Sequence, residues 1–390
     1  MRFGTKDHLG VKIQAGATGY FRWNFSRWDG GDTWAPDSAE SFPFVDFNSV
    51  CSEIQISMGL TVQGYDAQPE GSQATIILVA DDADPLDGLL IKVGNEVNLT
   101  LESYPSGTSS VPFWKGYVKS IQRDTDADGM NRVLITCGDR IEQLMSTVAT
   151  ISEIADQKFS DRWQSIYNAY PGSGLVLTGA SPIYEEFTFP GIDIFEVPLQ
   201  DTINETMAGE IGWLVVTRFG EIWPMSHGYL QHLLGQTAQY EIHQDVTDAH
   251  IPPTYINQSS NTDGIISTVI ARLTWDTATE VKVTNQDNAD LYGNSTLEVE
   301  LNLADETQLT NWANYALTLT DQDAIKALSV DAYDHRNMSL HKVYEWSPGT
   351  CVLVNVQAGL TNVNQNYLIS KINHMITPET WVTDLELWRN

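Results

Sequence analysis

Short stretches in which apolar and polar residues alternate recur along most of the chain. Alternation with a period of two is typical of β-strands that bury one face. The clearest stretches begin at Ala74, Val97, Val133 and Val352, and each is bounded by Gly, Asp, Asn or Pro, which favour turns. The pattern therefore predicts a protein built mainly from β-sheet.

Segments with helical spacing are few. The clearest is 305–319, where acidic residues precede an apolar stripe typical of an amphipathic helix. Its apolar positions are Leu309, Trp312, Ala313, Ala316 and Leu317. Two weaker helices are predicted from Ser160 to Tyr170 and from Asp201 to Glu210, with Gly212 closing the second. The fold class is therefore mainly β with a few helices.

The order of the strand segments is repeated in the two halves of the chain. In the first half the segments begin at Gly94, Tyr117 and Val133, and in the second half at Gly349, Tyr367 and Trp381. Each set predicts a three-strand meander with a hairpin between its last two strands. Together they indicate two β-barrel or sandwich units of similar build. Chance similarity among alternating strands is the competing explanation.

The length of 390 residues suggests two to four domains. The predicted division has an aromatic-rich N-terminal arm at 1–45, a first tube-like β-barrel domain at 46–150, an inserted α+β region at 151–262, and a second tube-like β-barrel domain at 263–390 that contains the helix at 305–319. The fold class thus becomes two tube-type β-barrel or sandwich domains with inserted α+β segments.

The N-terminal arm carries many aromatic residues, among them Trp23, Trp28 and Trp34, scattered between Gly and Asp rather than set at one period. Such an arm does not form a core by itself. Three interpretations stay open: it packs on its own domain, it packs on a neighbouring subunit, or its exposed Trp rings stack on sugars.

The charge of the chain says more about its binding partners than its overall composition does. The chain has 51 Asp and Glu against 21 Lys and Arg, a formal net charge of -30, and no run rich in Lys or Arg. Because phosphate binding depends on Lys and Arg that release counterions, this surface excludes stable nucleic-acid binding. Solubility is the simplest use of the excess acid.

The three cysteines, Cys51, Cys137 and Cys351, lie far apart and form no CxxC pair. This spacing indicates buried thiols rather than a zinc site or a disulfide framework. The N-terminus lacks the apolar run of a signal peptide, and no stretch reaches the 18 apolar residues of a membrane span. We therefore expect synthesis in the cytoplasm and no membrane span.

One segment matches half of a calcium-binding loop. Asp124, Asp126 and Asp128 occupy positions 1, 3 and 5, and Gly129 follows at position 6. Position 12 is Ile135, where a bidentate Glu is needed, and the segment joins two strands. We interpret it as a polar hairpin tip and keep these acids as weak metal candidates.

Motifs for catalysis are missing from the sequence, which has no nucleophile elbow, zinc-protease motif, phosphate loop or dinucleotide fingerprint. The neighbouring Glu185 and Glu186 offer a glycosidase pair, but some pairs arise by chance among so many acids. His374 is interpreted as a strand residue rather than a ligand. We expect no cofactor and no enzymatic activity.

Six segments follow one another in a fixed order: Ile54-Gln-Ile-Ser-Met-Gly, Ala74-Thr-Ile-Ile-Leu-Val, Phe113-Trp-Lys-Gly-Tyr-Val, Val133-Leu-Ile-Thr-Cys-Gly-Asp-Arg, Thr206-Met-Ala-Gly-Glu-Ile-Gly-Trp and Ile372-Asn-His-Met-Ile-Thr-Pro. In this order they resemble the minor tail proteins of long-tailed bacteriophages. The resemblance runs from about residue 45 to the end. Such proteins are similar to baseplate hubs in which two barrels per subunit let a homotrimer form a ring with pseudo-sixfold symmetry.

The resemblance implies a tail-tip hub in the virion. Its partners would be the distal tail protein, the tape-measure protein, and tail fibre or receptor-binding proteins, and DNA would pass through the ring during ejection without adhering. Candidate acids for the lumen are Asp81, Asp82, Asp84 and Asp87, which the sequence places on a solvated turn. The alternative function is a glycan-binding tail protein that uses the Trp-rich arm.

Overall fold

The computed structural model describes most of the chain. The described residues are 7–14, 44–46, 51–63, 66–80, 84–86, 91–103, 110–125, 130–170, 174–184, 187–244, 250–259, 265–319, 324–334, 339–340, 342–358, 361–377 and 380–389. Strands predominate and helices are few, so the predicted fold class is confirmed.

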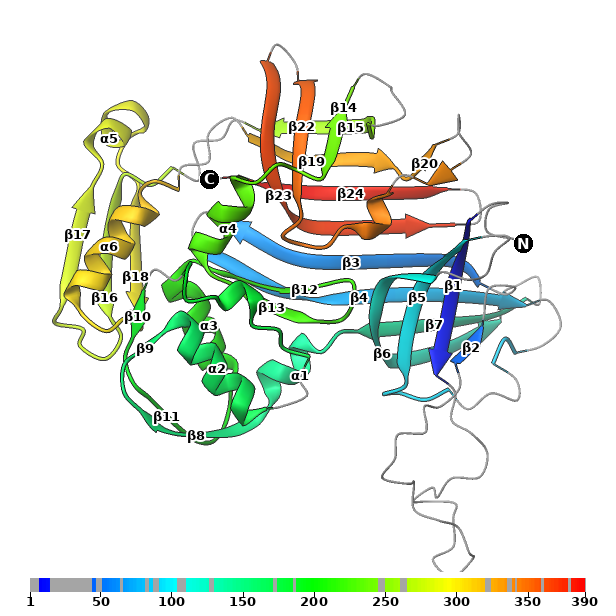
Figure 1. The fold of residues 1–390 in the computed structure, drawn as a ribbon, viewed down its shortest axis with the longest axis horizontal. Coiled ribbons are helices and arrows are strands. Elements are labelled where there is room, and N and C mark those ends of the chain that lie inside the picture. The colour runs from blue at the N-terminus through cyan, green and yellow to red at the C-terminus, as the bar shows by residue number, and fades with distance from the viewer. Residues whose placement is uncertain are drawn as a thin grey trace, which may run out of the picture.

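A sheet of 13 strands forms the centre of the molecule (Figure 1). Its strands are β1 (Asp7–Gln14), β2 (Phe44–Asp46), β3 (Cys51–Gln63), β4 (Asp66–Ala80), β5 (Glu96–Ser103), β6 (Ser110–Thr125), β7 (Asn131–Gly138), β14 (Tyr240–His243), β15 (Pro253–Ser259), β19 (Ala324–Asp331), β22 (Cys351–Ala358), β23 (Thr361–Ile376) and β24 (Trp381–Trp388). Their order is β15-β19-β24-β23-β3-β4-β7-β6-β5-β1-β2, with β22 beside β23 and β14 beside β22. The β14–β22 pair is parallel and the others are antiparallel.

The sheet contains the same five-strand arrangement twice. The first repeat has the spatial order β5-β6-β7-β4-β3, and the second has β22-β23-β24-β19-β15. In both, the long middle strand pairs through its first half with one meander strand and through its second half with the other. Both predicted meanders are therefore present, and each is extended by two further strands.

Matching backbone details support the duplication. Gly94 and Gly349, which precede β5 and β22, have φ angles of 90° and 87°. The Gly94 N–H donates to Val118 O, and the Gly349 N–H donates to Ile369 O, both at 2.8 Å. Since only glycine adopts this conformation without strain, the two sites need the same residue type. Chance alternation would not reproduce this geometry.

The bulges on β3 and β15 match as well. Each strand has a register shift near its start, and each bulge carries a hydroxyl side chain. Ser52 donates to Ile77 O, and Thr254 donates to Ser329 O, both at 3.1 Å. Bulges are specific features of a fold rather than defects, so this agreement also supports the structural equivalence of the repeats.

The two repeats are joined by β3 and β23. The antiparallel register runs from the Lys371–Gly59 pair to the Ile376–Ile54 pair. Apolar side chains from both repeats form one core, which includes Ile54, Ile76 and Ile372. The strands of both repeats thus share one sheet and one core. The predicted domain boundaries at residues 45, 150 and 262 stay a prediction.

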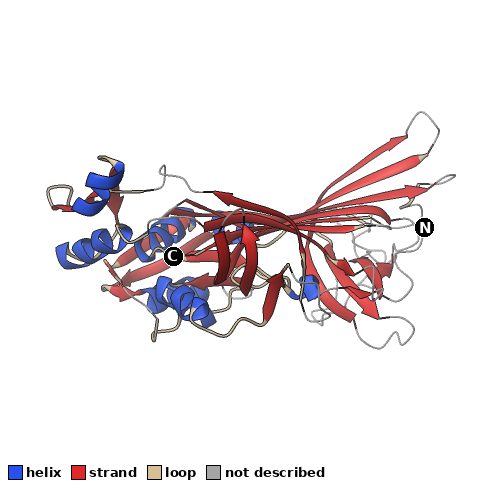
Figure 2. Cartoon of the chain, turned by 90° about the horizontal axis from the view of Figure 1, so that it is seen from above, coloured by secondary structure: helices blue, strands red, loops and turns tan. Residues whose placement is uncertain are grey.

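Two insertions carry the helices (Figure 2). Between β7 and β14 lie α1 (Ile141–Ser146), β8 (Val148–Ile154), β9 (Gln157–Lys158), α2 (Phe159–Ala169), the 3-10 helix η1 (Thr178–Ala180), β10 (Thr188–Phe189), β11 (Ile192–Pro198), α3 (Gln200–Glu210), β12 (Trp213–Val216), β13 (Ile222–Met225) and α4 (His227–Leu234). Between β15 and β19 lie β16 (Thr268–Leu273), β17 (Glu280–Thr284), α5 (Gln286–Tyr292), β18 (Thr296–Leu301) and α6 (Glu306–Ala316). Residues of both insertions pack into a second core.

Short elements connect β19 to β22. These are β20 (Tyr333–Asp334), β21 (Ser339–Leu340) and the 3-10 helix η2 (Lys342–Glu345). Trp346 follows η2 and is fully buried in the main core. No helix in the described part of the chain is long and apolar enough to cross a membrane.

The helices α2, α3 and α6 fall in the predicted segments, but the end of α3 differs from the expectation. Ile211, not a glycine, adopts the left-handed conformation there, with φ of 53°. Gly212 has another role: a Cβ at this position would lie 2.6 Å from Met225 O. The missing side chain lets β13 approach α3. The helix α4, which begins after the N-cap Ser226, was not predicted.

Candidate functional site

One face of the large sheet is covered by the core, and the other carries mostly polar side chains. Pairing across β19, β24, β23, β3, β4, β7 and β6 aligns residues in rows. One row contains Asp331, Val382, Met375, Gln55, Thr75, Thr136 and Ser120. The next contains Ser329, Asp384, Asn373, Ser57, Gln73, Gly138 and Tyr117. The row between them faces the core and is mostly apolar, for example Ile56, Ala74 and Cys137.

The two outward rows carry mainly hydroxyl and amide groups, little charge, and the exposed apolar side chains of Val382 and Met375. Their acidic members are Asp331 and Asp384, and neither row contains Lys or Arg. Ser329 Oγ donates to Asp384, which occupies part of that carboxylate. Because cations are what hold phosphates, a surface of this chemistry gives a polyanion no strong attachment. We name these two rows the polar face.

Of the four predicted lumen acids, the structure describes Asp84. The other three, Asp81, Asp82 and Asp87, lie outside the described residues. Asp84 Oδ2 accepts from Arg123 Nε of β6 at 2.8 Å. Its slight burial alone would raise the pKa of Asp84, but the hydrogen bond from the Leu86 N–H and the Arg123 guanidinium outweigh this and lower the pKa. Asp84 therefore ties a connecting segment to β6, and its lumen role stays a prediction.

The other acidic and aromatic candidates are described only in part. Asp124 is exposed on β6 and pairs in register with Arg132 of β7, so the segment joins two antiparallel strands as expected. Candidates that lie outside the described residues are Asp126, Asp128, Trp23, Trp28, Trp34, Glu185 and Glu186. Within the described ranges, no three His, Cys, Asp or Glu side chains gather as metal ligands would.

The cysteines are free thiols, and two of them are deeply buried. Burial raises the pKa of Cys51 and of Cys137 to about 12. Cys351 is half-buried, and burial raises its pKa as well. High thiol pKa values keep these side chains protonated and unreactive. The prediction of buried thiols is confirmed for Cys51 and Cys137, while Cys351 is more accessible than expected.

His374 lies in β23, as expected for a strand residue. Its Nδ1 lies 2.9 Å from Thr383 Oγ1 and accepts from Trp381 Nε1 at 3.2 Å. Complete burial lowers the pKa of His374 to about 3, so the ring is neutral at pH 7. His374 thus belongs to the packing of the sheet rather than to a ligand site.

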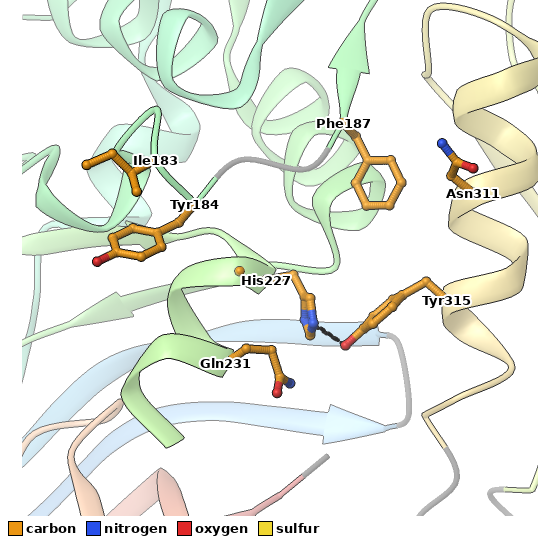
Figure 3. Close-up of a pocket in the computed structure, with 8 residues that line it drawn as sticks. Ile183, Tyr184, Phe187, His227, Gln231, Asn311 and Tyr315 are labelled. Atoms are coloured by element: carbon orange, nitrogen blue, oxygen red, sulfur yellow. Dashed lines mark hydrogen bonds between the residues drawn. The ribbon is translucent and has the colours of Figure 1, made fainter. Parts of the chain in front are cut away.

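A pocket of about 590 Å³ opens between α4, α6 and the segment before β10 (Figure 3). It is lined by Ile183, Tyr184, Phe187, His227, Gly228, Gln231, Asn311 and Tyr315. The Tyr315 hydroxyl is hydrogen-bonded to the His227 ring, which links the two insertions. This pocket was not predicted, because its walls come from three separate segments of the sequence, 183–187, 227–231 and 311–315.

The chemistry of the pocket does not favour acid–base catalysis near neutral pH. Burial lowers the pKa of His227 to about 4, so its ring stays neutral. General acid–base groups work best when their pKa lies near the operating pH. Among the described lining residues, His227 is the titratable imidazole and Tyr184 and Tyr315 supply phenols. The His227–Tyr315 contact is best explained as a structural link.

Comparison with known proteins places the fold. No family model matches the sequence, and no curated protein has a significant match. Among solved structures, a tail protein from Neisseria meningitidis MC58 aligns with a TM-score of 0.61 at 11% identity, over 98% of this chain and 97% of that chain. The 43 kDa tail protein of prophage MuSo2 from Shewanella oneidensis aligns with a TM-score of 0.58 at 11% identity, over 97% and 98%.

A larger assembly contains the same fold. A chain of the Francisella PdpA–VgrG complex aligns with a TM-score of 0.53 at 8% identity, over 99% of this chain and 58% of that chain. The protein therefore has the fold of phage tail proteins, and the resemblance found in the sequence is confirmed at the level of the fold. At these identities the likeness shows the fold alone.

Proposed function

We propose that the protein is a structural subunit of a phage tail tip, and that three copies form a closed ring at the end of the tail tube. The duplicated five-strand repeat carries this proposal. Three chains with two repeats each would give six similar units, which matches a ring with pseudo-sixfold symmetry. The shared fold with tail proteins supports the same role.

In this ring the polar face lines the central channel. Its hydroxyl and amide groups would let DNA pass without adhering, and the net charge of -30 would repel a polyanion further. Neutral polar residues dominate this surface, whereas the sequence predicted a channel lined by the acids of the turn at 81–87. The acids Asp331 and Asp384 would supply the charge at one side of it.

The helical insertions would serve the partners. Most of the helices gather at one end of the molecule, away from the outer ends of the long strands (Figure 2). We propose that the distal tail protein and the tape-measure protein meet one side of the ring, and that fibre or receptor-binding proteins meet the other. In this role the protein acts by assembly rather than by catalysis.

Size-exclusion chromatography with light scattering, followed by negative-stain electron microscopy, tests the ring. The expected result is a particle with three times the mass of the chain and a central channel. A stable monomer at high concentration, with no ring in the images, would contradict the proposal.

The lining is tested separately by adding positive charge to the polar face. A Gln55→Lys and Thr136→Lys variant should still form rings, because both side chains lie on the face opposite the core. It should retain DNA fragments at low salt and release them as salt rises. A variant with Phe195→Lys and Leu291→Lys is the control, because both side chains are exposed and lie in the helical insertions, on β11 and α5. Equal DNA retention by both variants would contradict the proposal that the polar face lines the channel.

A further inference from the structure

Each repeat has an edge strand that can pair with the middle strand of another repeat, but the described part of the chain makes only one such joint, between β3 and β23. We propose that β15 of one copy pairs, antiparallel, with the second half of β6 of the next copy. This joint would repeat between chains the contact that β3 makes with β23 inside one chain. The inference rests on the proposed ring and names the strands that close it.

The strands of the two joints are equivalent by position in the repeats. The edge strand β3 corresponds to β15, since each flanks the matching strand, β4 or β19. The middle strand β23 corresponds to β6, and both carry a bulge at the same point, between Val118 and Ser120 in β6 and between Ile369 and Lys371 in β23. The β3–β23 register therefore provides a template for a β15–β6 register.

The outer edge of β15 has no strand beside it among the described residues, since β15 pairs with β19 alone. Its Tyr255 is 57% exposed, and Ile256 is only half-buried. The equivalent of Ile256 is Ile54, which is fully buried beneath the β3–β23 joint. An open strand edge presents unpaired N–H and C=O groups and favours pairing with another chain.

The second half of β6 also has an outer edge with no strand beside it among the described residues. The side chains of Gln122, Arg123, Asp124 and Thr125 are all exposed. The equivalent stretch of β23, 373–376, alternates instead, with His374 and Ile376 buried. The two stretches differ in their neighbours: β3 pairs with this part of β23, whereas within the described chain this part of β6 pairs only with β7.

The template fixes the register between copies. The internal pairs Ile376–Ile54 and Met375–Gln55 correspond to Thr125–Ile256 and Asp124–Asn257. In the second pair the Asn257 amide can donate to the Asp124 carboxylate. Since each chain offers one edge of each kind, the contact is head to tail, and it closes into a ring rather than a twofold dimer.

A paired cysteine experiment tests this register. In the full chain, Asp124→Cys with Asn257→Cys should form disulfides between copies on mild oxidation, giving covalent dimers and trimers on a non-reducing gel. The internal counterpart, Gln55→Cys with Met375→Cys, should form a disulfide within one chain, because these residues pair in register and both are exposed. Each single variant should stay monomeric on the gel.

A mispaired variant provides the negative control. Asp124→Cys with Val382→Cys combines two exposed positions that the template keeps apart, and it should not cross-link. Rings that form normally without an Asp124–Asn257 cross-link, while the internal pair does cross-link, would overturn the inference and leave the ring intact. Absence of rings in light scattering would overturn the proposed function together with the inference.

Hydrogen exchange on the unmodified protein gives a second measurement. Raising the protein concentration from dilute monomer to assembled ring should slow exchange at the amides of 122–125 and 256–258. The amides of β4, which is paired on both sides within the chain, should keep their rates. Unchanged exchange at both edges during assembly would contradict the proposed joint.

Discussion

The two repeats share one topology, but they differ in what surrounds it. In the first, β3 and β4 follow each other directly as a long hairpin; in the second, the equivalent strands β15 and β19 are separated by the segment 260–323. The second half of the middle strand β23 pairs with β3 at its outer edge, whereas among the described residues the second half of the middle strand β6 pairs only with β7. The difference shows that the repeated unit tolerates large changes at its hairpin and keeps its strand order with or without a neighbour at the outer edge of its middle strand.

The largest expected effect comes from breaking the internal joint. Gly59 has a φ of 131°, and a Cβ there would lie 2.1 Å from Ser370 O and 2.7 Å from Lys371 Cα. Gly59→Ala should lower the free energy of unfolding by roughly 3 kcal/mol or more, because backbone atoms must move apart. Urea denaturation measures it. Gly71→Ala is the control, since its Cβ would meet only the side chains of Glu142 and Ile141; equal losses in both variants would contradict the account.

The buried histidine of the joint predicts a dependence on pH. The folded-state pKa of His374 is about 3, below its ordinary value of 6.5, so the folded protein holds the neutral ring. As pH falls from 6.5 to 3, the unfolded chain binds a proton that the folded chain does not. Stability should therefore be lost over this range, at about 1.4 kcal/mol per pH unit from this group.

A His374→Gln variant isolates that contribution. The stability advantage of the wild type over this variant should shrink steadily as pH falls from 6.5 to 3, measured by urea denaturation at each pH. His227 shifts in the same direction, to a pKa of about 4, so His227→Gln is a matched comparison outside the joint. A wild-type advantage that stays constant with pH would disprove the assignment.

The paired glycines sharpen the comparison between the repeats. Gly94→Ala and Gly349→Ala should each lower stability by about 1–2 kcal/mol, because both residues have positive φ. The loss should be greater at Gly349, where a Cβ would lie 2.8 Å from Met225 Cε, while nothing lies within 4 Å at Gly94. A double variant with Met225→Ala should remove the excess, which a double-mutant cycle measures. Identical losses at both glycines without that change would contradict the packing difference.

The smallest effect is expected at the two bulges. Ser52→Ala should lower stability by about 1 kcal/mol through loss of its hydrogen bond to Ile77 O. Thr254→Val should lower the stability of the monomer by less, because Thr254 is exposed on the free edge. Thermal unfolding of each variant measures both, with Thr254→Ser as a control that keeps the hydroxyl. A larger loss at Thr254 than at Ser52 in the monomer would reverse the comparison.

Much of the local structure was predictable from the sequence, because alternation and helical spacing are local signals. The meanders beginning at Gly94 and Gly349 and the helix ending at Ala316 follow from such patterns. The joint between Gly59 and Lys371 does not, because alternation shows which face a strand buries and not which strand lies beside it. Pairing of segments about 300 residues apart depends on packing that no local pattern contains.

The candidate surfaces were predicted less well. The sequence indicates the acid-rich turn at 81–87 as a candidate lining of the channel. In the structure, however, Asp84 of this turn is hydrogen-bonded to Arg123. The polar face is made of single Ser, Thr and Gln residues, each unremarkable in its own strand, such as Gln55, Thr75 and Thr136. Only the register of the sheet brings them into a row. The His227–Tyr315 pocket likewise needs the insertions to fold before its residues meet.

The segment between β15 and β19 also shows how such a protein can acquire new parts. There a complete sheet with two helices occupies the place of a hairpin turn, and the strands on both sides keep their pairing. The matching place in the first repeat, after Gln63 and before Asp66, holds no such module. It is therefore a natural position for grafting a foreign domain, such as an affinity tag or an enzyme, with the sheet left undisturbed.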